Sequence, residues 1–314
     1  MTDYTVRRDY WDRPIVGKPG APPITTWEEK RNSKKTWWTT PDGKGYGRAS
    51  GAAKGLDTKE GLIDWAACQA AVGVLLDSSA RSDVATLVNE YGDPWNAVSD
   101  DKFSPKDRLK QAVEKARNTA GQNTASSAGT EMHKLAELHN QGVSPRIVQP
   151  HLVEMFEHYK QAVAPFEFLG QELLIVNDTL ELCGSVDYLM RVPAGARTPD
   201  GTVWREPLVV VGDLKTGRWD ARYPMSVTCQ LAAYGTGLRY EQDRNVRLPL
   251  HDQINTDWGL LVHFPIMSTD PQVRFYWVDL RLGLRAALLG RQVDEMRSVF
   301  KRKDAELTEL EFVT

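Results

Sequence analysis

The stretch that most constrains the fold of this chain spans residues 208–217 and reads Leu-Val-Val-Val-Gly-Asp-Leu-Lys-Thr-Gly. Its apolar run consists of β-formers and predicts a strand buried in a sheet. Because side chains alternate between the faces of a strand, Asp213 and Lys215 point to one side while Leu214 points into the core. Burying a carboxylate and an ammonium is unfavourable unless they pair, bind a metal ion or meet a ligand. Our working hypothesis is that Asp213 holds a divalent metal ion and that Lys215 orients or activates a water molecule.

The composition is that of an ordinary globular protein, with 314 residues of which 41% are hydrophobic and 26% are charged. This length suffices for one large domain or two small ones. No apolar run approaches the roughly 18 residues needed to cross a membrane, and the N-terminus lacks the apolar segment of a signal peptide. We therefore expect a cytoplasmic protein without a membrane partner.

The three cysteines, Cys68, Cys183 and Cys229, are far apart in the sequence. An odd number at such spacing argues against a disulfide framework, and no Cys-x-x-Cys pair suggests zinc. We expect each cysteine to be a small buried apolar residue.

Hydrophobic periodicity predicts helices first and strands later. The expected helices span residues 57–77, 82–91, 104–120, 124–139, 150–164, 223–240 and 284–303. The expected strands span residues 171–177, 180–192, 203–215, 258–266 and 273–280. This order predicts an α/β fold with a mixed central β-sheet flanked by helices and preceded by a helical N-terminal region.

Three regions follow from this pattern: an irregular arm at residues 1–45, a helical region at 46–122 and a core at 123–314. The arm interleaves tryptophans with lysines and arginines, a combination that suits stacking on bases and contact with phosphates. The alternative is that these tryptophans attach the arm to the body of the protein. The net charge of −3 does not exclude DNA, because a local basic patch decides such binding.

Four short motifs stand out on the expected helices and strands. They are Gly129-x-x-x-His133, Gly184-Ser-Val-Asp187, Asp213-Leu-Lys215 and Gln230-x-x-x-Tyr234. Each of them alone is compatible with an ordinary structural role. A lone helical histidine is more often a surface or core residue, and Asp213 with Lys215 can be a simple ion pair at the end of a strand.

Together and in this order, the four motifs resemble the RecB-like branch of the PD-(D/E)XK nuclease superfamily. In that family a helical histidine, an aspartate after a hairpin, a strand-borne Asp-x-Lys and a helical Gln-x-x-x-Tyr assemble one metal site. The resemblance covers about residues 129–240. Residues 45–75, which begin Gly-Tyr-Gly-Arg, are similar to the leader of phage-encoded members.

The resemblance implies a set of metal ligands. These would be His133, Asp187, Asp213 and the main-chain carbonyl of Leu214, holding Mg²⁺ or Mn²⁺. Oxygen ligands suit such hard ions, and one imidazole is compatible with Mn²⁺. Lys215 would position the attacking water and stabilise the charge that develops on the phosphate.

The resemblance also implies supporting roles. Glu172, on the first strand of the hairpin, would lie near the metal as a further catalytic carboxylate. Gln230 and Tyr234, one helical turn apart, would brace the site or contact DNA. Thr216 would bond a phosphate or simply end the strand, and Arg48 in the leader would bind DNA.

Some branches of the family carry an iron–sulfur cluster on four cysteines. This chain has three cysteines, and their spacing fits no cluster motif. We therefore expect no iron–sulfur cluster.

The expected function is a metal-dependent DNA exonuclease in recombination, repair or replication. Its partners would be DNA and, as in some relatives, a recombination or helicase protein. Two alternatives remain open: a non-catalytic DNA-binding or assembly module on a nuclease fold, and a structure-specific endonuclease of the same superfamily.

Overall fold

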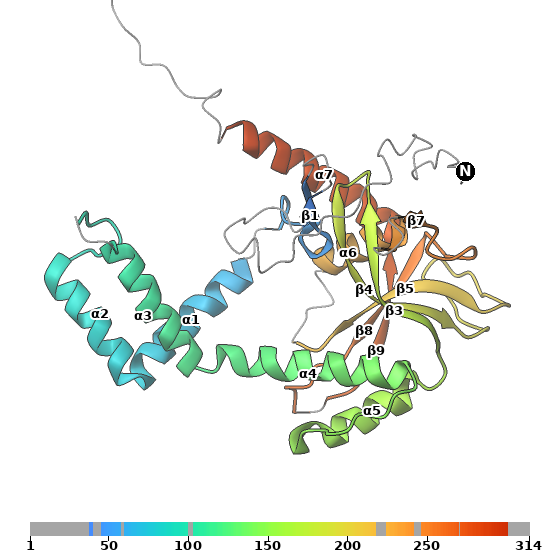
Figure 1. Ribbon diagram of the computed structural model, residues 1–314, viewed down its shortest axis with the longest axis horizontal. Helices are drawn as coiled ribbons and strands as arrows, with labels where there is room; N and C mark the ends of the chain where they lie inside the picture. Colours follow the sequence, from blue (N-terminus) through green and yellow to red (C-terminus); the bar gives the residue numbers. More distant parts are fainter. Residues whose placement is uncertain are drawn as a thin grey trace, which may run out of the picture. The chain divides into compact units, whose positions relative to one another are not determined.

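The computed structural model describes residues 38–39, 45–57, 60–99, 103–217, 224–241, 246–269 and 271–300 (Figure 1). Contacts divide the chain into two compact units. The first comprises Met1–Asp57 and His133–Thr314, and the second comprises Thr58–Met132. The predicted arm at 1–45 lies almost entirely outside the described residues. Residues 46–57, predicted to belong to the helical region, are part of the first unit because they contact its sheet.

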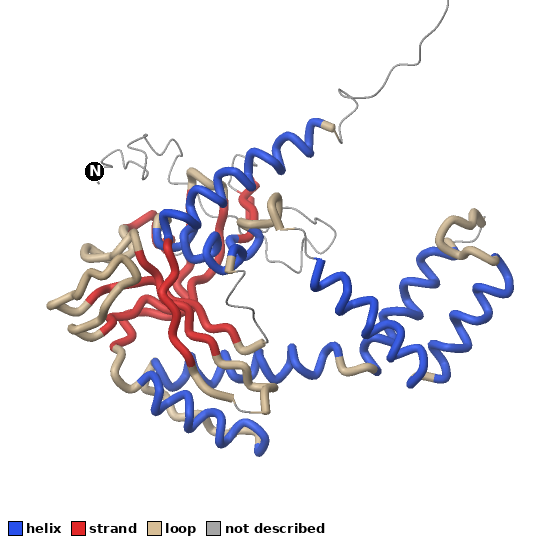
Figure 2. The backbone as a smooth tube through the Cα atoms, turned by 180° about the vertical axis from the view of Figure 1, so that it is seen from behind, coloured by secondary structure: helices blue, strands red, loops and turns tan. Residues whose placement is uncertain are grey.

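The first unit is built on a mixed sheet, which Figure 2 shows in red. Its described strands are β2 (Gly45–Arg48), β3 (Glu167–Asn177), β4 (Leu182–Val192), β5 (Leu208–Lys215), β6 (Leu238–Glu241), β7 (Val246–Leu248), β8 (Trp258–His263) and β9 (Arg274–Asp279). The order is β7-β6-β3-β4-β5-β8-β9, and β2 pairs with the start of β4. The two-residue strand β1 (Trp38–Thr39) pairs with β2.

Both parallel and antiparallel pairs occur in this sheet. Strand β5 is parallel to β8 and antiparallel to β4, while β3 and β4 form an antiparallel hairpin. The predicted strand 203–215 begins later, at Leu208, and its first seven residues are buried. The predicted α/β class with a mixed central sheet flanked by helices is confirmed.

Among the described residues, four α-helices belong wholly or partly to this unit. They are α4 (Gln122–Asn140), which crosses the boundary between the units, α5 (Val153–Val163), α6 (Met225–Gly235) and α7 (Leu280–Val299). Both ribbon views show α6 and α7 on one side of the sheet and α5 on the other (Figures 1 and 2).

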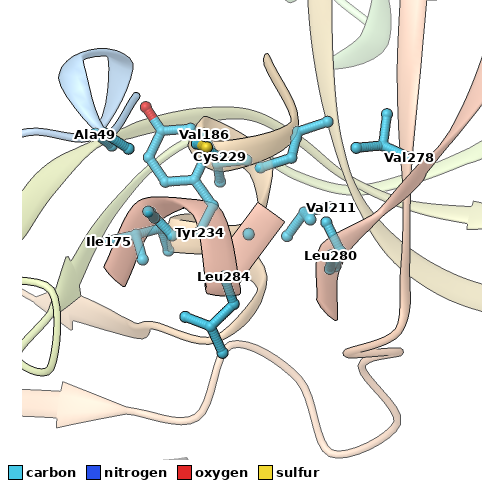
Figure 3. Close-up of a cluster of buried hydrophobic side chains, with 14 of the residues drawn as sticks. Ala49, Ile175, Val186, Val211, Cys229, Tyr234, Val278, Leu280 and Leu284 are labelled. Carbon is cyan, nitrogen blue, oxygen red and sulfur yellow. The ribbon is translucent and has the colours of Figure 1, made fainter. Parts of the chain in front are cut away.

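Helix α6 packs into the main hydrophobic core. Figure 3 shows Tyr234 and Cys229 of α6 among residues of the sheet and of α7, with Ala49 beside them. Ala49 begins a short 3-10 turn, η1 (Ala49–Gly51), that directly follows β2. The segment after β2 is therefore part of the core around α6.

The predicted helix 223–240 is wrong after Gly235. Helix α6 ends at Gly235, and the chain re-enters the sheet as β6. A side chain at Gly237 would meet Ile175, with its Cβ 2.5 Å from the Cγ2 of that residue. The chain can therefore pass this close to β3 only at a glycine, and Tyr240 is then buried in the sheet.

The second unit consists of helices. They are α1 (Glu60–Leu76), α2 (Ser78–Tyr91), α3 (Pro105–Thr119) and the first part of α4. Ser104 caps α3 and Pro105 occupies its first turn. Helix α2 begins four residues earlier than predicted, because the carboxylate of Asp77 accepts a hydrogen bond from the N–H of Ala80 (2.9 Å).

Helices α1 and α3 approach closely at Gly73. A Cβ at Gly73 would lie 2.0 Å from the carbonyl oxygen of Ala116.

None of the described helices is long and apolar enough to cross a membrane.

Candidate active site

The candidate site forms where β4 and β5 separate. Their backbone pairing ends at Tyr188 and Gly212. The next two residues in register would be Asp187 and Asp213, which lie beyond that pairing. There the Oδ2 of Asp187 accepts the N–H of Leu214 (2.8 Å), so a side chain replaces the strand partner. The loss of pairing thus leaves two carboxylates at the end of a buried strand.

Asp213 is the most enclosed member of the site, with 1% of its surface exposed. Its Oδ2 lies 2.6 Å from the Nζ of Lys215, and its Oδ1 accepts a hydrogen bond from the Nε2 of Gln230 (2.9 Å). The Nζ of Lys215 also donates to the Oε1 of Gln230 (3.4 Å). Gln230 therefore bridges the carboxylate and the ammonium. The predicted common face of Asp213 and Lys215 is confirmed.

His133 reaches the site from α4. Its Nδ1 lies 3.7 Å from the Oδ2 of Asp187. Burial lowers the pKa of His133 below its ordinary value, although the Asp213 carboxylate opposes this shift. The imidazole is consequently neutral at neutral pH, the form in which histidine ligates metals.

The two aspartates are held close enough to repel each other. Burial and then the charge of Asp213 raise the pKa of Asp187 well above its ordinary value. Burial lowers the pKa of Lys215, but the nearby Asp213 carboxylate outweighs this effect. The pKa of the ammonium is therefore raised. The site thus holds two carboxyl groups, Asp187 and Asp213, against one ammonium.

Glu172 adds a third carboxylate to this group. Its neighbours Gln171 and Leu173 pair with Tyr188 and Val186, which places Glu172 level with Asp187 across the hairpin. Glu172 is an exposed residue, but partial burial of its carboxyl group, and then the Glu137 carboxylate on α4, raise its pKa.

The backbone of Glu172 has a φ of +48°, the left-handed region that side chains other than glycine rarely adopt. Such strain is found mainly where a structure fixes a functional side chain.

Leu214 directs its own backbone groups toward β4. The carbonyl of the next residue, Lys215, accepts the N–H of Phe264 (2.8 Å), on the β8 side. Because successive residues of a strand direct their backbone groups to opposite sides, the carbonyl of Leu214 lies on the β4 side, as does its N–H, which donates to Asp187. This is the direction required of the predicted main-chain ligand.

The structure also brings Tyr234 and Arg48 together. Tyr234 is buried one turn after Gln230, and a Cβ at Gly184 would lie 3.0 Å from its hydroxyl. Arg48 is an exposed residue at the end of β2. Partial burial of its guanidinium lowers the pKa of that group, and the nearby Tyr234 acts in the opposite direction. The leader segment at 45–48 therefore lies beside α6.

Thr216 is buried directly after β5. Its carbonyl accepts the N–H of Ile266 (3.2 Å). This hydrogen bond lies just beyond the parallel pairing of β5 with β8. Thr216 thus has the second of its two predicted roles, which is to end the strand.

A chain of buried hydroxyls and one amide was not foreseen from the sequence. The Nδ2 of Asn140 donates to the Tyr159 hydroxyl (2.8 Å), which lies 3.0 Å from the Tyr188 hydroxyl. Asn140 follows His133 by seven residues, so both lie on one face of α4. The seven-residue spacing of His133 and Asn140 was the sequence signal that could have indicated this chain of hydrogen bonds. The chain ties α4 to α5 and to β4, next to Asp187.

The cysteines follow the prediction only in part. Cys183 and Cys229 are buried, as expected, whereas Cys68 is exposed on α1. Helix α1 keeps most of its side chains at the surface of its unit, so apolar character alone did not imply burial at this position.

The donor set fits Mg²⁺ or Mn²⁺. Within the described ranges no three His, Cys, Asp or Glu side chains converge as a ready-made ligand set, and Asp213 instead contacts Lys215 and Gln230. The chemistry of the group nevertheless favours a divalent cation, because the carboxyl groups of Asp187 and Asp213 lie near a neutral imidazole.

Neither a scan against models of protein families nor a search of curated proteins finds a match to this chain. The geometry and chemistry of the site are therefore the basis for assigning a function.

Proposed function

We propose that this chain is a metal-dependent deoxyribonuclease with a PD-(D/E)XK-type fold of the RecB-like branch, and that it digests DNA from its ends. One observation carries the proposal. Asp213 lies buried and Asp187 lies mostly buried where β4 and β5 separate, and Lys215 and Gln230 both contact Asp213, so that two carboxyl groups gather beside one ammonium.

Hydrolysis of a phosphodiester bond requires positive charge at the phosphate and a positioned water molecule. His133, Asp187, Asp213 and the carbonyl of Leu214 would hold Mg²⁺ or Mn²⁺. When bound, such an ion supplies a Lewis acid for the phosphate oxygens and for water.

Lys215 is the residue best placed to act on the substrate. Its side chain is 36% exposed while its Nζ contacts Asp213, so the ammonium can reach both the carboxylate and an incoming phosphate. It would donate hydrogen bonds to the attacking water and to the phosphate oxygen on which charge develops.

Gln230 and Tyr234 would act as positioning residues. Both side chains are buried, and Gln230 holds the Asp213 carboxylate and the Lys215 ammonium at once. This burial favours bracing of the site over contact with DNA. Glu172 would add negative charge beside the metal, and Arg48 at the surface would contact a phosphate.

The setting of the reaction follows from the same resemblance. A phage-encoded enzyme of this kind would act in the cytoplasm of the host cell, in recombination, repair or replication. A helicase or recombination protein would be a natural partner. We propose no iron–sulfur cluster.

A digestion series tests the proposal. End-labelled linear duplex, single-stranded and covalently closed circular DNA are incubated with the protein and Mg²⁺ or Mn²⁺. We expect loss of the linear substrates from their ends and an intact circle, and we expect Asp213→Ala and Lys215→Ala to be inactive. Asp252→Ala, which removes an exposed carboxylate of the same unit, is the matched control.

The other outcomes separate the alternatives. Cleavage of circular or branched DNA would favour a structure-specific endonuclease. DNA binding without cleavage under either metal would favour a non-catalytic module. Equal activity of wild type and both site variants would refute the assignment of the site.

A further inference from the structure

Helix α3 of the second unit presents basic side chains along one face. At about 100° per residue, Lys106, Lys110 and Arg117 fall within an arc of roughly 40°. Between Lys106 and Arg117 the helix rises by about 16 Å at ~1.5 Å per residue. The face is therefore a narrow row of positive charge.

Each end of this row carries a tryptophan. The Nζ atoms of Lys106 and Lys110 lie 4.0 Å and 5.8 Å from the ring centroid of Trp95. The guanidinium of Arg117 lies 6.0 Å from the ring of Trp65 on α1. Trp95 and Trp65 are 51% and 42% exposed, so the described part of the unit leaves a large part of each side chain accessible to solvent.

The other basic residues of α3 are engaged differently. Arg108 pairs with Glu90 (3.8 Å), and Lys115 contacts both Asp83 (4.0 Å) and the hydroxyl of Ser79 (2.6 Å). These contacts tie α3 to α2. Structural ion pairing thus accounts for the cations on the far side of the helix.

One cation of the tryptophan face also makes an ionic contact, within α3 itself. Lys110 lies 3.4 Å from Asp107, but both side chains are more than half exposed. A surface pair of this kind holds its ammonium only loosely. The Nε of Arg117 is buried, and among the described residues it has no hydrogen-bond partner. Lys106 and Lys110 could therefore donate hydrogen bonds to a phosphate without breaking a buried contact.

We propose that the face formed by Trp65, Trp95, Lys106, Lys110 and Arg117 binds single-stranded DNA. Partly exposed aromatic rings beside cations are the arrangement that stacks unpaired bases and neutralises the adjacent phosphates. Stacking requires a free base face, which a duplex does not offer. An acidic peptide would engage the cations but would gain little from the indole. The choice of DNA rests on the proposed function, whereas the site itself lies within the second unit.

Fluorescence anisotropy with a fluorescein-labelled dT₁₅ oligonucleotide in EDTA tests this site on the full chain. Trp95→Ala should weaken binding about tenfold at every salt concentration, because a stacking contact is lost. Trp95→Phe should recover most of the affinity. The double variant Lys106→Gln/Lys110→Gln should lower the slope of log K against log salt by about 1.4, since each phosphate contact contributes about 0.7 for a single strand.

Lys115→Gln is the matched control, because it removes one charge from the opposite side of the same helix. Its affinity should stay within about twofold of wild type, since Lys115 lies away from the row. Equal affinity of Trp95→Ala and wild type would overturn the proposal. So would a glutamate peptide that binds as tightly and weakens in the same variants.

Failure of this proposal can be distinguished from failure of the nuclease assignment. The oligonucleotide is bound without metal, so Asp213→Ala should bind it normally although it does not digest DNA. Weaker binding by Trp95→Ala supports the site even where the wild-type protein digests nothing.

Discussion

Asp187 combines burial with a neighbouring carboxylate, and both disfavour its charged form. The hydrogen bond from the Leu214 N–H favours the charged form but does not offset them. Residues arranged for binding or catalysis are commonly placed at the expense of stability. Asp187 is the residue of the site at which the demands of function and of stability differ most clearly.

We predict that Asp187→Asn stabilises the metal-free protein at pH 8. The pKa of Asp187 is higher in the folded than in the unfolded state, so the folded protein binds more protons between those two values. The contribution of Asp187 to the free energy of unfolding is therefore retained at low pH and lost as the pH rises through the folded pKa. The loss is about 1.4 kcal/mol for each unit by which the folded pKa exceeds the unfolded pKa.

The measurement is the free energy of unfolding in urea for both proteins at pH 5 and pH 8. The advantage of the asparagine variant should grow with pH. An advantage that is absent, or that does not change between the two pH values, would show that Asp187 is not disfavoured in its charged form.

Gln230 raises a second question at the scale of the residue, because its side chain could brace the site or contact DNA. Its two hydrogen bonds to Asp213 and Lys215 predict bracing. We expect Gln230→Leu to lower the single-turnover cleavage rate by about 10–100-fold, as is typical for groups that orient ligands, with DNA affinity nearly unchanged. Loss of affinity with a normal rate would instead indicate direct contact with DNA.

At the scale of the element, the position of α4 depends on its attachment to α5 and β4. Asn140, Tyr159 and Tyr188 make this attachment, and burial raises the pKa of Tyr159 to about 12, so its hydroxyl stays protonated. His133 lies two turns away on the same face of α4. The hydrogen-bonded chain therefore sets the distance between His133 and Asp187.

Tyr159→Phe should leave the fold intact and weaken Mn²⁺ binding about tenfold. Removing the hydroxyl leaves Asn140 and Tyr188 without a buried partner, which also destabilises the protein by about 1–3 kcal/mol. Electron paramagnetic resonance of free Mn²⁺ measures the affinity. Tyr240→Phe, at a buried tyrosine on β6, is the control for general loosening. Equal Mn²⁺ affinity in both variants would contradict the positioning role.

At the scale of the whole molecule, local signals predicted the elements that carry the site. The valine-rich run became β5, and the spaced motifs brought Lys215 and Gln230 to Asp213 and placed His133 beside Asp187. These features depend on strand alternation and helix periodicity, which can be read over a few residues.

Features set by tertiary contact were missed. Strand β6 was predicted as helix, since only its approach to β3 fixes its conformation. The parallel pairing of Gly47 and Arg48 with β4 joins segments more than 130 residues apart. The left-handed backbone of Glu172 likewise depends on its neighbours in the sheet. Such long-range effects override local propensity and leave no short sequence signal.

The central claim is that Asp213 and Lys215 catalyse hydrolysis of DNA with a divalent metal. The most direct test is the single-turnover rate of digestion of end-labelled linear DNA in Mg²⁺. We predict a rate at least about a hundredfold lower for Asp213→Asn and for Lys215→Met, with the oligonucleotide affinity in EDTA preserved in each. Rates equal to that of the wild type, or DNA that stays intact with wild-type protein under both Mg²⁺ and Mn²⁺, would contradict the claim.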